Sequence, residues 1–410
     1  MRHVVVMVAT SYPRFPGDGI GSFMEPIAKG VAARGHEVHL VAPWHPAITR
    51  AKVEDGVFFH FFHYAPVASL NVFGYAAGLK ADTDVRAAAW LVAPIALAAG
   101  AFKARRVATK RRATVLHGHW IVPGGAMALA ARGRHPLVVS AHGSDVFLAE
   151  RNGMARRAAR AVLRRAAWVT ACSDDLRDRS IALGASASRA ETVPYGVDST
   201  RFAPSADARA SIRRTLDIGD APLVFSAGRL VRKKGLEFLI DAARPLVRTF
   251  PTARIVIAGD GDLREELTAR AAALGGRTIS FVGALPQDEI ARWMAAADVV
   301  TVPSVHDDAG NVDGLPNFAL EAMASATPVV ATTAGGLAQA ISDGVTGRSV
   351  PERDAPALAA AIGDLLAHPT DARRLGAAAR ARVERDFGWT RSAERFEAIY
   401  DGAARPPVLS

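Results

Sequence analysis

The chain has 410 residues, half of them hydrophobic, which allows two domains with substantial cores. Its single cysteine, Cys172, excludes intrachain disulfides and a cluster of thiolate metal ligands, and it fits a reducing, cytoplasmic compartment. The net charge of +10 favours anionic partners, whether nucleic acid, an anionic membrane surface or anionic small ligands.

The first half alternates apolar, strand-like runs with helical segments. Val4–Ala9 predicts a buried strand rather than a signal peptide, because the run is short and reaches Tyr12-Pro13 without a cleavage site. A helix is predicted from about Ser22 to Arg34, and Gly35 ends it. Further strands are predicted at Val38–Ala42, Val115–His117, Leu137–Ala141, Val169–Ala171 and Glu191–Pro194.

The alternation restarts after a turn-rich linker, which we place near residues 197–210. It predicts an α/β fold of two successive doubly wound domains, each a parallel sheet with helices on both faces. Ligands of such domains bind at the carboxyl ends of the strands. The second set of strands is predicted at Pro222–Ser226, Arg254–Ala258, Ile279–Val282, Val299–Pro303, Pro328–Thr332 and Gly347–Val350.

Several segments of the first half have a composition that suits contact with a membrane. Residues Ala87 to Phe102 are uncharged but fall short of the roughly 20 residues of a bilayer span, which predicts a buried or interfacial helix. Two basic patches are either solvated faces or contacts for anionic lipid headgroups, and together with the aromatic run Phe58–Tyr64 they predict peripheral attachment to the membrane. Aromatic residues are not interleaved with these charges, so a nucleic-acid groove is a poor fit. The patches are Lys103, Arg105, Arg106, Lys110, Arg111 and Arg112, and Arg156, Arg157, Arg160, Arg164 and Arg165.

Four glycine loops follow predicted strands, at residues 18–22, 226–235, 258–262 and 333–337. Glycine lets the backbone approach a phosphate, although the loops at 18–22 and 258–262 could also be plain turns and the one at 226–235 a solvated face. The loop at 226–235 adds Arg229, a bidentate phosphate ligand, and the point charge of Lys234. His142 follows a strand and is either a ligand contact or a structural histidine. His117 and His119 have no third metal ligand at a recognisable spacing, so we expect no metal site.

The segment Asp313-Gly-Leu-Pro-Asn-Phe-Ala-Leu-Glu321 places two carboxylates around the start of a helix. Pro316 is tolerated only near a helix start, so Asp313 lies in the loop before the helix and Glu321 lies one to two turns inside it. The free amides of a first helical turn favour anions. This arrangement suits a sugar nucleotide, with its diphosphate on amides and its hydroxyls on carboxylates.

Taken in order, these motifs resemble family 4 glycosyltransferases over essentially the whole chain. The markers are the glycine loop at 19–21, Ala-Arg-Gly-His-Glu-Val at 33–38, His-Gly-Ser-Asp at 142–145, Val-Pro-Tyr-Gly-Val-Asp at 193–198, Gly-Arg-Leu…Lys-Gly at 228–235 and the spaced carboxylates. The resemblance implies a retaining, sugar-nucleotide-dependent enzyme of the GT-B fold, with two Rossmann-like domains facing across a cleft. It implies an acceptor domain at 1–203, a donor domain at 204–386 and a closing helix at 387–410 that returns to the first domain.

The resemblance also implies roles for single residues. Arg229, Lys234, Gly228 and the amides near Leu315 and Asn317 would bind the donor diphosphate. Glu321 would hold the ribose hydroxyls, and the Leu285 backbone would meet the base. Asp313 and His142 would lie by the transferred sugar, with His142 aiding catalysis, while Gly19 and Gly21 would line the gap between acceptor and phosphate.

The resemblance therefore predicts transfer of a hexose from a UDP- or GDP-sugar to a lipid-linked or glycan acceptor, without a cofactor. Asp313 departs from the glutamate usual in the family, and residues 306–312 form a longer loop than in simple members, which leaves the donor sugar open. Two alternatives stay open as well: a sugar-nucleotide epimerase of the same fold, and a non-catalytic nucleotide-binding protein at the membrane surface.

Overall fold

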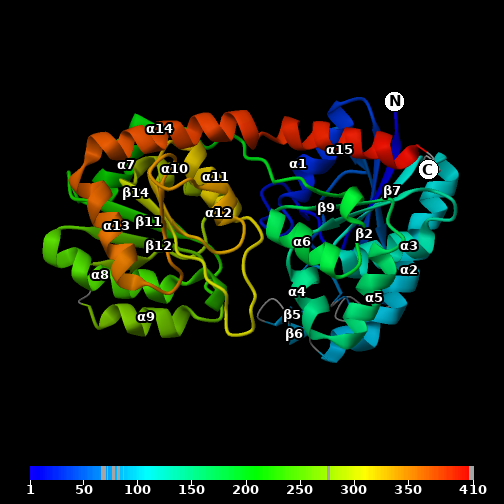
Figure 1. The fold of residues 1–410 in the computed structure, drawn as a ribbon, viewed down its shortest axis with the longest axis horizontal. Coiled ribbons are helices and arrows are strands. Elements are labelled where there is room, and N and C mark those ends of the chain that lie inside the picture. The colour runs from blue at the N-terminus through cyan, green and yellow to red at the C-terminus, as the bar shows by residue number, and fades with distance from the viewer. Residues whose placement is uncertain are drawn as a thin grey trace. The chain divides into compact units, whose positions relative to one another are not determined.

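The computed structural model describes residues 1–65, 71, 73–75, 79–80, 84–85, 87–274 and 278–405. The chain forms two compact units, one of Met1–Pro194 with Trp389–Ser410 and the other of Tyr195–Gly388 (Figure 1). The last five residues of the predicted closing segment, 406–410, lie outside the described residues.

The first unit is built on a sheet with the strand order β10-β9-β8-β7-β1-β2-β4-β3. Its pairs are parallel except β3 with β4, as the alternation of strands and helices predicts. The strand order reverses between β1 and β7, which makes the carboxyl ends of these strands the expected ligand position. The strands are β1 (Val4–Val8), β2 (Glu37–Pro43), β3 (Val53–Glu54), β4 (Val57–Phe62), β7 (Val115–His119), β8 (Leu137–Ala141), β9 (Trp168–Ala171) and β10 (Ala190–Thr192), with a separate pair β5 (Leu79–Lys80) and β6 (Asp84–Val85).

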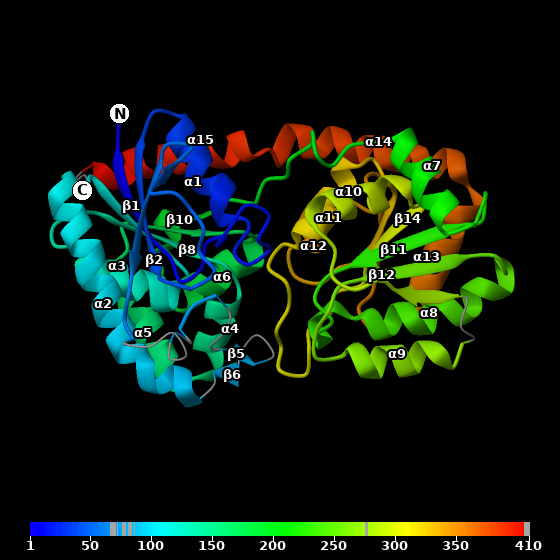
Figure 2. The same cartoon turned by 180° about the vertical axis from the view of Figure 1, so that it is seen from behind.

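Helices flank this sheet (Figure 2). Alternate residues of β1 face α1 and α15, because Val5 and Met7 belong to one apolar core with Ile27 and Ile399. The helices are α1 (Met24–Ala33), α2 (Ala87–Arg111), α3 (Ala126–Ala131), α4 (Ser144–Arg151), α5 (Gly153–Leu163), α6 (Asp174–Ala182) and α15 (Trp389–Ala404).

The second unit has an entirely parallel sheet with the order β13-β12-β11-β14-β15-β16. Its strand order reverses between β11 and β14, which places the expected ligand position at their carboxyl ends. The strands are β11 (Leu223–Ala227), β12 (Arg254–Ala258), β13 (Ile279–Phe281), β14 (Val299–Val302), β15 (Val329–Thr332) and β16 (Arg348–Val350).

Both faces of this second sheet are covered. Val224 lies in a core with residues of α8 and α13, while the neighbouring Phe225 contacts the rings of Trp293 and Phe318 on the other face. The helices are α7 (Ala206–Thr215), α8 (Leu236–Thr249), α9 (Arg264–Ala272), α10 (Gln287–Ala296), α11 (Asn317–Ala324), α12 (Leu337–Ala340), α13 (Ala355–Ala367) and α14 (Pro369–Asp386).

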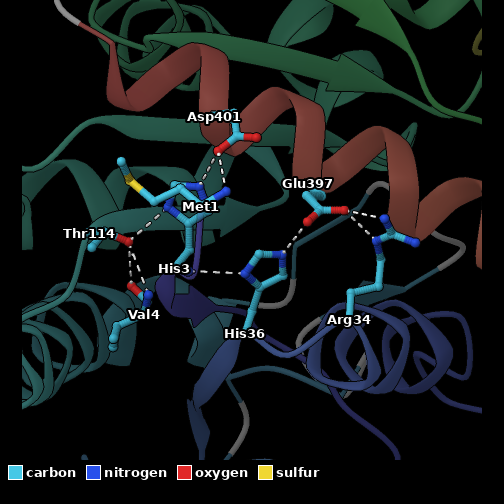
Figure 3. A network of polar contacts seen from close by, with 8 residues as sticks. All are labelled: Met1, His3, Val4, Arg34, His36, Thr114, Glu397 and Asp401. Atoms are coloured by element: carbon cyan, nitrogen blue, oxygen red, sulfur yellow. Dashed lines mark hydrogen bonds and ion pairs between the residues drawn. The ribbon is translucent and has the colours of Figure 1, made fainter.

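The C-terminal helix α15 belongs to the first unit, as predicted, and packs on α1. Its polar face is attached to the N-terminal residues (Figure 3). Asp401 accepts a hydrogen bond from His3 Nε2 at 2.9 Å and lies 3.4 Å from the Met1 amine. Glu397 accepts from Arg34 Nε at 2.5 Å and lies 3.4 Å from His36 Nε2. The first and last helices of this unit are therefore joined by both apolar and charged contacts.

One surface prediction is wrong. The aromatic run Phe58–Tyr64 was expected on a membrane-facing surface, but most of it is strand β4, which pairs in parallel with β2. Phe59, Phe62 and Tyr64 are buried, because alternate residues of a strand inside a sheet face the core. The segment from 87 to 102 is helical, as predicted, and forms the first part of α2.

Candidate active site

The loop Gly228–Gly235 connects β11 to α8 at the point where the strand order of the second sheet reverses. Gly235 has a φ of +60°, and an added Cβ would lie 2.0 Å from the carbonyl oxygen of Pro303. Only glycine therefore allows this loop to lie against the end of β14. The single turn Arg232–Lys234 inside the loop carries three consecutive cations.

Two of these cations converge on Asp313. Lys234 Nζ lies 2.6 Å from Asp313 Oδ2, and Lys233 Nζ lies 3.1 Å from Oδ1. Burial alone would raise the pKa of Asp313, but the two ammonium groups outweigh it and hold that pKa well below its usual range. Asp313 is thus ionised, and it holds both lysine side chains at the carboxyl ends of β11 and β14.

Glu321 lies in α11, which begins at Asn317 directly after Pro316, as predicted. Among the described residues none forms an ion pair with Glu321, and burial raises its pKa to about 7 against the opposing effects of Lys234 and Arg201. The two carboxylates of this segment therefore differ: Asp313 is neutralised by lysines, whereas Glu321 is a partly buried acceptor without an ion pair to any described residue.

Two further glycine loops pack against the segments that carry Asp313 and Lys234. A Cβ on Gly335 would lie 2.2 Å from the Asp313 carbonyl oxygen, and one on Gly336 would lie 2.0 Å from that of Gly314. A Cβ on Gly259 would lie 1.8 Å from the carbonyl oxygen of Gly228. The loop at 333–337 thus packs against the backbone at 313–314, and the loop at 258–262 packs against the backbone of Gly228. This close packing explains why these positions are glycine.

The other predicted donor residues lie in the same unit. Gly228 is next to Lys234, since an added Cβ would be 3.3 Å from Lys234 Cε. Arg229 is exposed, Leu315 is buried, and Leu285 lies between β13 and α10. Asn317 Oδ1 is buried and has no hydrogen-bond partner in the described part of the chain, so it is available to a ligand donor.

His142 lies in the first unit, directly after β8. Its ring contacts those of Phe23 and Trp120, with centroids 4.7 and 4.9 Å away, and its Nε2 is 3.1 Å from His119 Nδ1. The buried Asp145 accepts hydrogen bonds from the amides of His142 and Ile121 and thereby joins the loops after β8 and β7. Its burial raises the pKa of Asp145.

The predicted glycine pair lies in the loop after β1. Gly21 has a φ of +67°, whereas Gly19 has no atom within 4 Å of an added Cβ, so open space adjoins it. Asp18 shapes the loop by accepting hydrogen bonds from the Ile20 amide and from the side chain of Arg14. Because Phe23 contacts His142, the end of this loop lies beside the predicted catalytic histidine.

Four residues beside these sites were not predicted as site residues: Lys233, Phe23, Trp120 and His119. Lys233 could have been recognised from its position next to Lys234, and His119 from the His-Gly-His pattern at a strand end. Phe23 and Trp120 gave no such signal, because their proximity to His142 arises only when β1, β7 and β8 lie side by side.

Two family models match the chain. One, described as Glycosyltransferase Family 4, matches residues 17–201, and one described as Glycosyl transferases group 1 matches residues 221–368. A GDP-mannose-dependent alpha-(1-6)-phosphatidylinositol monomannoside mannosyltransferase of Mycolicibacterium smegmatis is 36% identical over 66% of this chain and 71% of its own. A glycogen synthase of Mycobacterium tuberculosis is 30% identical over 98% and 95%.

Solved structures with the same fold cover nearly the whole chain. A sucrose-phosphate synthase from Thermosynechococcus elongatus matches with a TM-score of 0.77 at 24% identity, covering 98% of each chain. The HepE protein of Anabaena in complex with UDP matches with a TM-score of 0.76 at 21% identity, covering 97% of this chain and 99% of its own.

Proposed function

Because the chain belongs to glycosyltransferase family 4, the retaining group 1 glycosyl transferases of the GT-B fold, we propose that it transfers a hexose from a UDP- or GDP-sugar to a lipid-linked or glycan acceptor. The synthesis of a cell-envelope glycolipid or an exopolysaccharide is the setting we propose. The second unit binds the donor, and the first unit binds the acceptor.

One observation carries this proposal: Lys233 and Lys234 lie where the strand order of the second sheet reverses, close enough to the Glu321 carboxylate for Lys234 to affect its pKa. Negative charge grows on the leaving diphosphate as the glycosidic bond breaks, and Lys234, Lys233 and Arg229 are the groups that stabilise it. Glu321 accepts hydrogen bonds from the ribose hydroxyls, which give its partly buried carboxylate polar partners. The leaving phosphate accepts the proton of the attacking acceptor hydroxyl.

The relatives suggest which substrates to assay first. The mycolicibacterial relative is GDP-mannose-dependent and acts on a phosphatidylinositol monomannoside, and the HepE protein was solved with UDP. We therefore propose to screen GDP-mannose and UDP-glucose as donors by thermal shift, because a ligand that binds the native state raises the melting temperature. Phosphatidylinositol mannosides and short glucans form the first acceptor panel.

Arg229→Ala tests the assignment. It should lower acceptor-dependent donor turnover by roughly 10²–10³-fold because the leaving diphosphate loses a charge-assisted hydrogen bond. Arg244→Ala, on the exposed side of α8, is the matched control and should retain wild-type turnover. Unchanged turnover of Arg229→Ala would refute the donor site, and an altered sugar nucleotide formed without acceptor would identify an epimerase.

We also propose that the first unit attaches to anionic membranes through α2 and α5, which both pack against α3. Ile95 and Phe102 of α2 are 60% and 70% exposed, seven residues apart, and Arg105 and Arg106 follow on the same helix. On α5, Met154 is exposed beside a row of exposed arginines. Exposed apolar side chains next to cations fit the interface of an anionic bilayer. None of the described helices combines the length and the apolar content of a membrane span.

Vesicle flotation tests this attachment. The protein should float with phosphatidylglycerol vesicles at about 50 mM salt and lose most of this binding at about 500 mM, because salt screens the attraction. Phe102→Ser combined with Arg105→Gln should weaken the binding, whereas Arg244→Gln in the second unit should not. Equal binding to uncharged phosphatidylcholine vesicles, or no binding at low salt, would contradict the proposal.

A further inference from the structure

Three imidazoles lie close together at the carboxyl ends of β7 and β8: His117 and His119 are fully buried, and His142 is partly buried. His119 pairs with Ser140 in the sheet register, so it reaches the level of His142, two residues further along the neighbouring strand. The rings of His119 and His142 are almost parallel, at 12°, and their facing nitrogens, Nδ1 and Nε2, are 3.1 Å apart. The third ring, that of His117, lies 4.0 Å from the His119 ring.

His117 takes no hydrogen bond from this row, because both of its nitrogens are occupied. Its Nδ1 lies 2.8 Å from the Tyr400 hydroxyl of α15, and its Nε2 lies 2.7 Å from Ser140 Oγ. The Tyr400 hydroxyl can donate to Nδ1, which leaves the His117 proton on Nε2 to be donated to Ser140. His117 therefore supports His119 through ring contact alone.

His119 has a single hydrogen-bond partner, His142, within the described chain. Its Nε2 is buried without a partner there, and burial lowers the pKa of His119 to about 3. A neutral imidazole carries one proton, which lies on either Nδ1 or Nε2. Unpaired buried N–H groups are rarer in proteins than unpaired acceptors, so the favoured form has the proton on Nδ1 and donates it to His142 Nε2.

We propose that His119 is a positioning residue that fixes His142 in the form protonated on Nδ1, so that His142 acts as a hydrogen-bond donor rather than as a base. With Nε2 accepting from His119, the single proton of a neutral His142 is on Nδ1. The Phe23 and Trp120 rings restrict rotation of the imidazole around this bond. In the proposed reaction the leaving phosphate accepts the proton of the acceptor hydroxyl, so this form of His142 supplies a hydrogen-bond donor and no base is needed from it. This inference rests on the proposed function for the identity of the substrate.

Two substitutions of His119 separate positioning from packing. Asn places an amide N–H where His119 has Nδ1–H, whereas Phe keeps the ring and loses the hydrogen bond. We expect His119→Phe to lower kcat by about tenfold or more with little change in donor KM, and His119→Asn to stay within about threefold of wild type. A residue that only fills space would give the opposite order, and that result would overturn the proposal.

Nitrogen-15 NMR of histidine-labelled full-length protein shows which nitrogen of His142 carries the proton, without a measurement of activity. His142, assigned through His142→Gln, should carry its proton on Nδ1 in the wild type and lose this preference in His119→Phe. A wild-type His142 protonated on Nε2 would refute the inference even if neither His119 variant folds. Absence of sugar transfer by the wild type would instead refute the proposed function, and the NMR result would still stand by itself.

Discussion

At the scale of single residues, Asp313 and Glu321 belong to one segment, but their surroundings shift the pKa values of their carboxyl groups in opposite directions. Asp313 lies between two ammonium groups and keeps the cations of the loop in place before any donor arrives. A donor diphosphate then competes with a carboxylate for lysines that are already positioned, which reduces the cost of ordering them. Glu321 has no ion pair with a described residue and its pKa is raised to about 7, so the stability of the folded protein depends on pH through this group.

Glu321→Gln should stabilise the protein at about pH 8 and have little effect at about pH 5. The folded protein keeps the Glu321 proton up to about pH 7, whereas the unfolded chain releases it near the ordinary pKa of 4.5. The folded state binds more protons in this window, so its stability falls as the pH rises through it, by up to roughly 3 kcal/mol. Glutamine carries no charge and avoids this loss.

Urea unfolding of both proteins at the two pH values measures the difference. The exposed Glu265→Gln of α9 is the control and should change the free energy of unfolding little at either pH. A Glu321→Gln effect of the same size at both pH values would show that an uncompensated buried charge is not its cause.

At the scale of elements, each sheet places its candidate residues at the strand ends where the order reverses. In the second unit the loops after β11, β12, β14 and β15 contact one another through glycine backbones, so one loop cannot move without the next. Close backbone packing of this kind tolerates no side chain. The loop at 258–262 carries none of the cations of the site, but its packing determines the shape of the loop at 228–235, which carries them.

Gly259→Ala should destabilise the second unit and weaken donor binding together. The new Cβ would meet the Gly228 carbonyl oxygen at 1.8 Å, and the φ of +134° already disfavours alanine. We expect a loss of about 2 kcal/mol or more, as for other overpacked or strained positions. Calorimetry and nucleotide titration measure the two effects.

Gly363→Ala is the matched control for this loop variant. Gly363 lies in α13, and its added Cβ would have its nearest neighbour at 3.7 Å, an ordinary contact distance. Alanine favours the helix there, so stability should be equal or slightly higher. A Gly259→Ala protein as stable as Gly363→Ala would argue against the support role of this loop.

At the scale of the whole molecule, the chain leaves the first unit after Pro194 and returns to it at Trp389. The last helix supplies Phe396, Ile399 and Tyr400 to the core that contains β1 and α1, and its Tyr400 hydroxyl reaches His117. The core of the first unit is therefore complete only when α15 has been synthesised.

Ile399→Ala should lower the stability of the first unit by about 2–4 kcal/mol, since Ile399 is fully buried and its removal leaves a cavity. Hydrogen exchange should become faster in β1 and α1 and stay unchanged in β11 and β12. Arg391→Ala, at an exposed position of the same helix, should change neither. Faster exchange confined to the second unit would contradict this assignment of α15.

Strands, helices and the loops between them could be predicted from local pattern, because apolar periodicity and glycine turns are properties of neighbouring residues. The strand bounds differ from the predictions by one or two residues, as at β10, where Pro194 has no N–H for the ladder. Two-residue strands such as β3 were not predicted, because they are too short for a period. The family resemblance, the parallel sheets and the return of the last helix were predicted and are confirmed.

The sequence by itself determined that a carboxylate precedes a helix, that cations follow a strand and that a histidine ends another. Only the tertiary structure decided that Lys233 and Lys234 neutralise Asp313, that burial raises the pKa of Glu321, and that His119 faces His142. The physical reason is that charge and hydrogen bonding depend on distances between segments far apart in the chain. Those distances are set by strand pairing and backbone packing, which no local pattern contains.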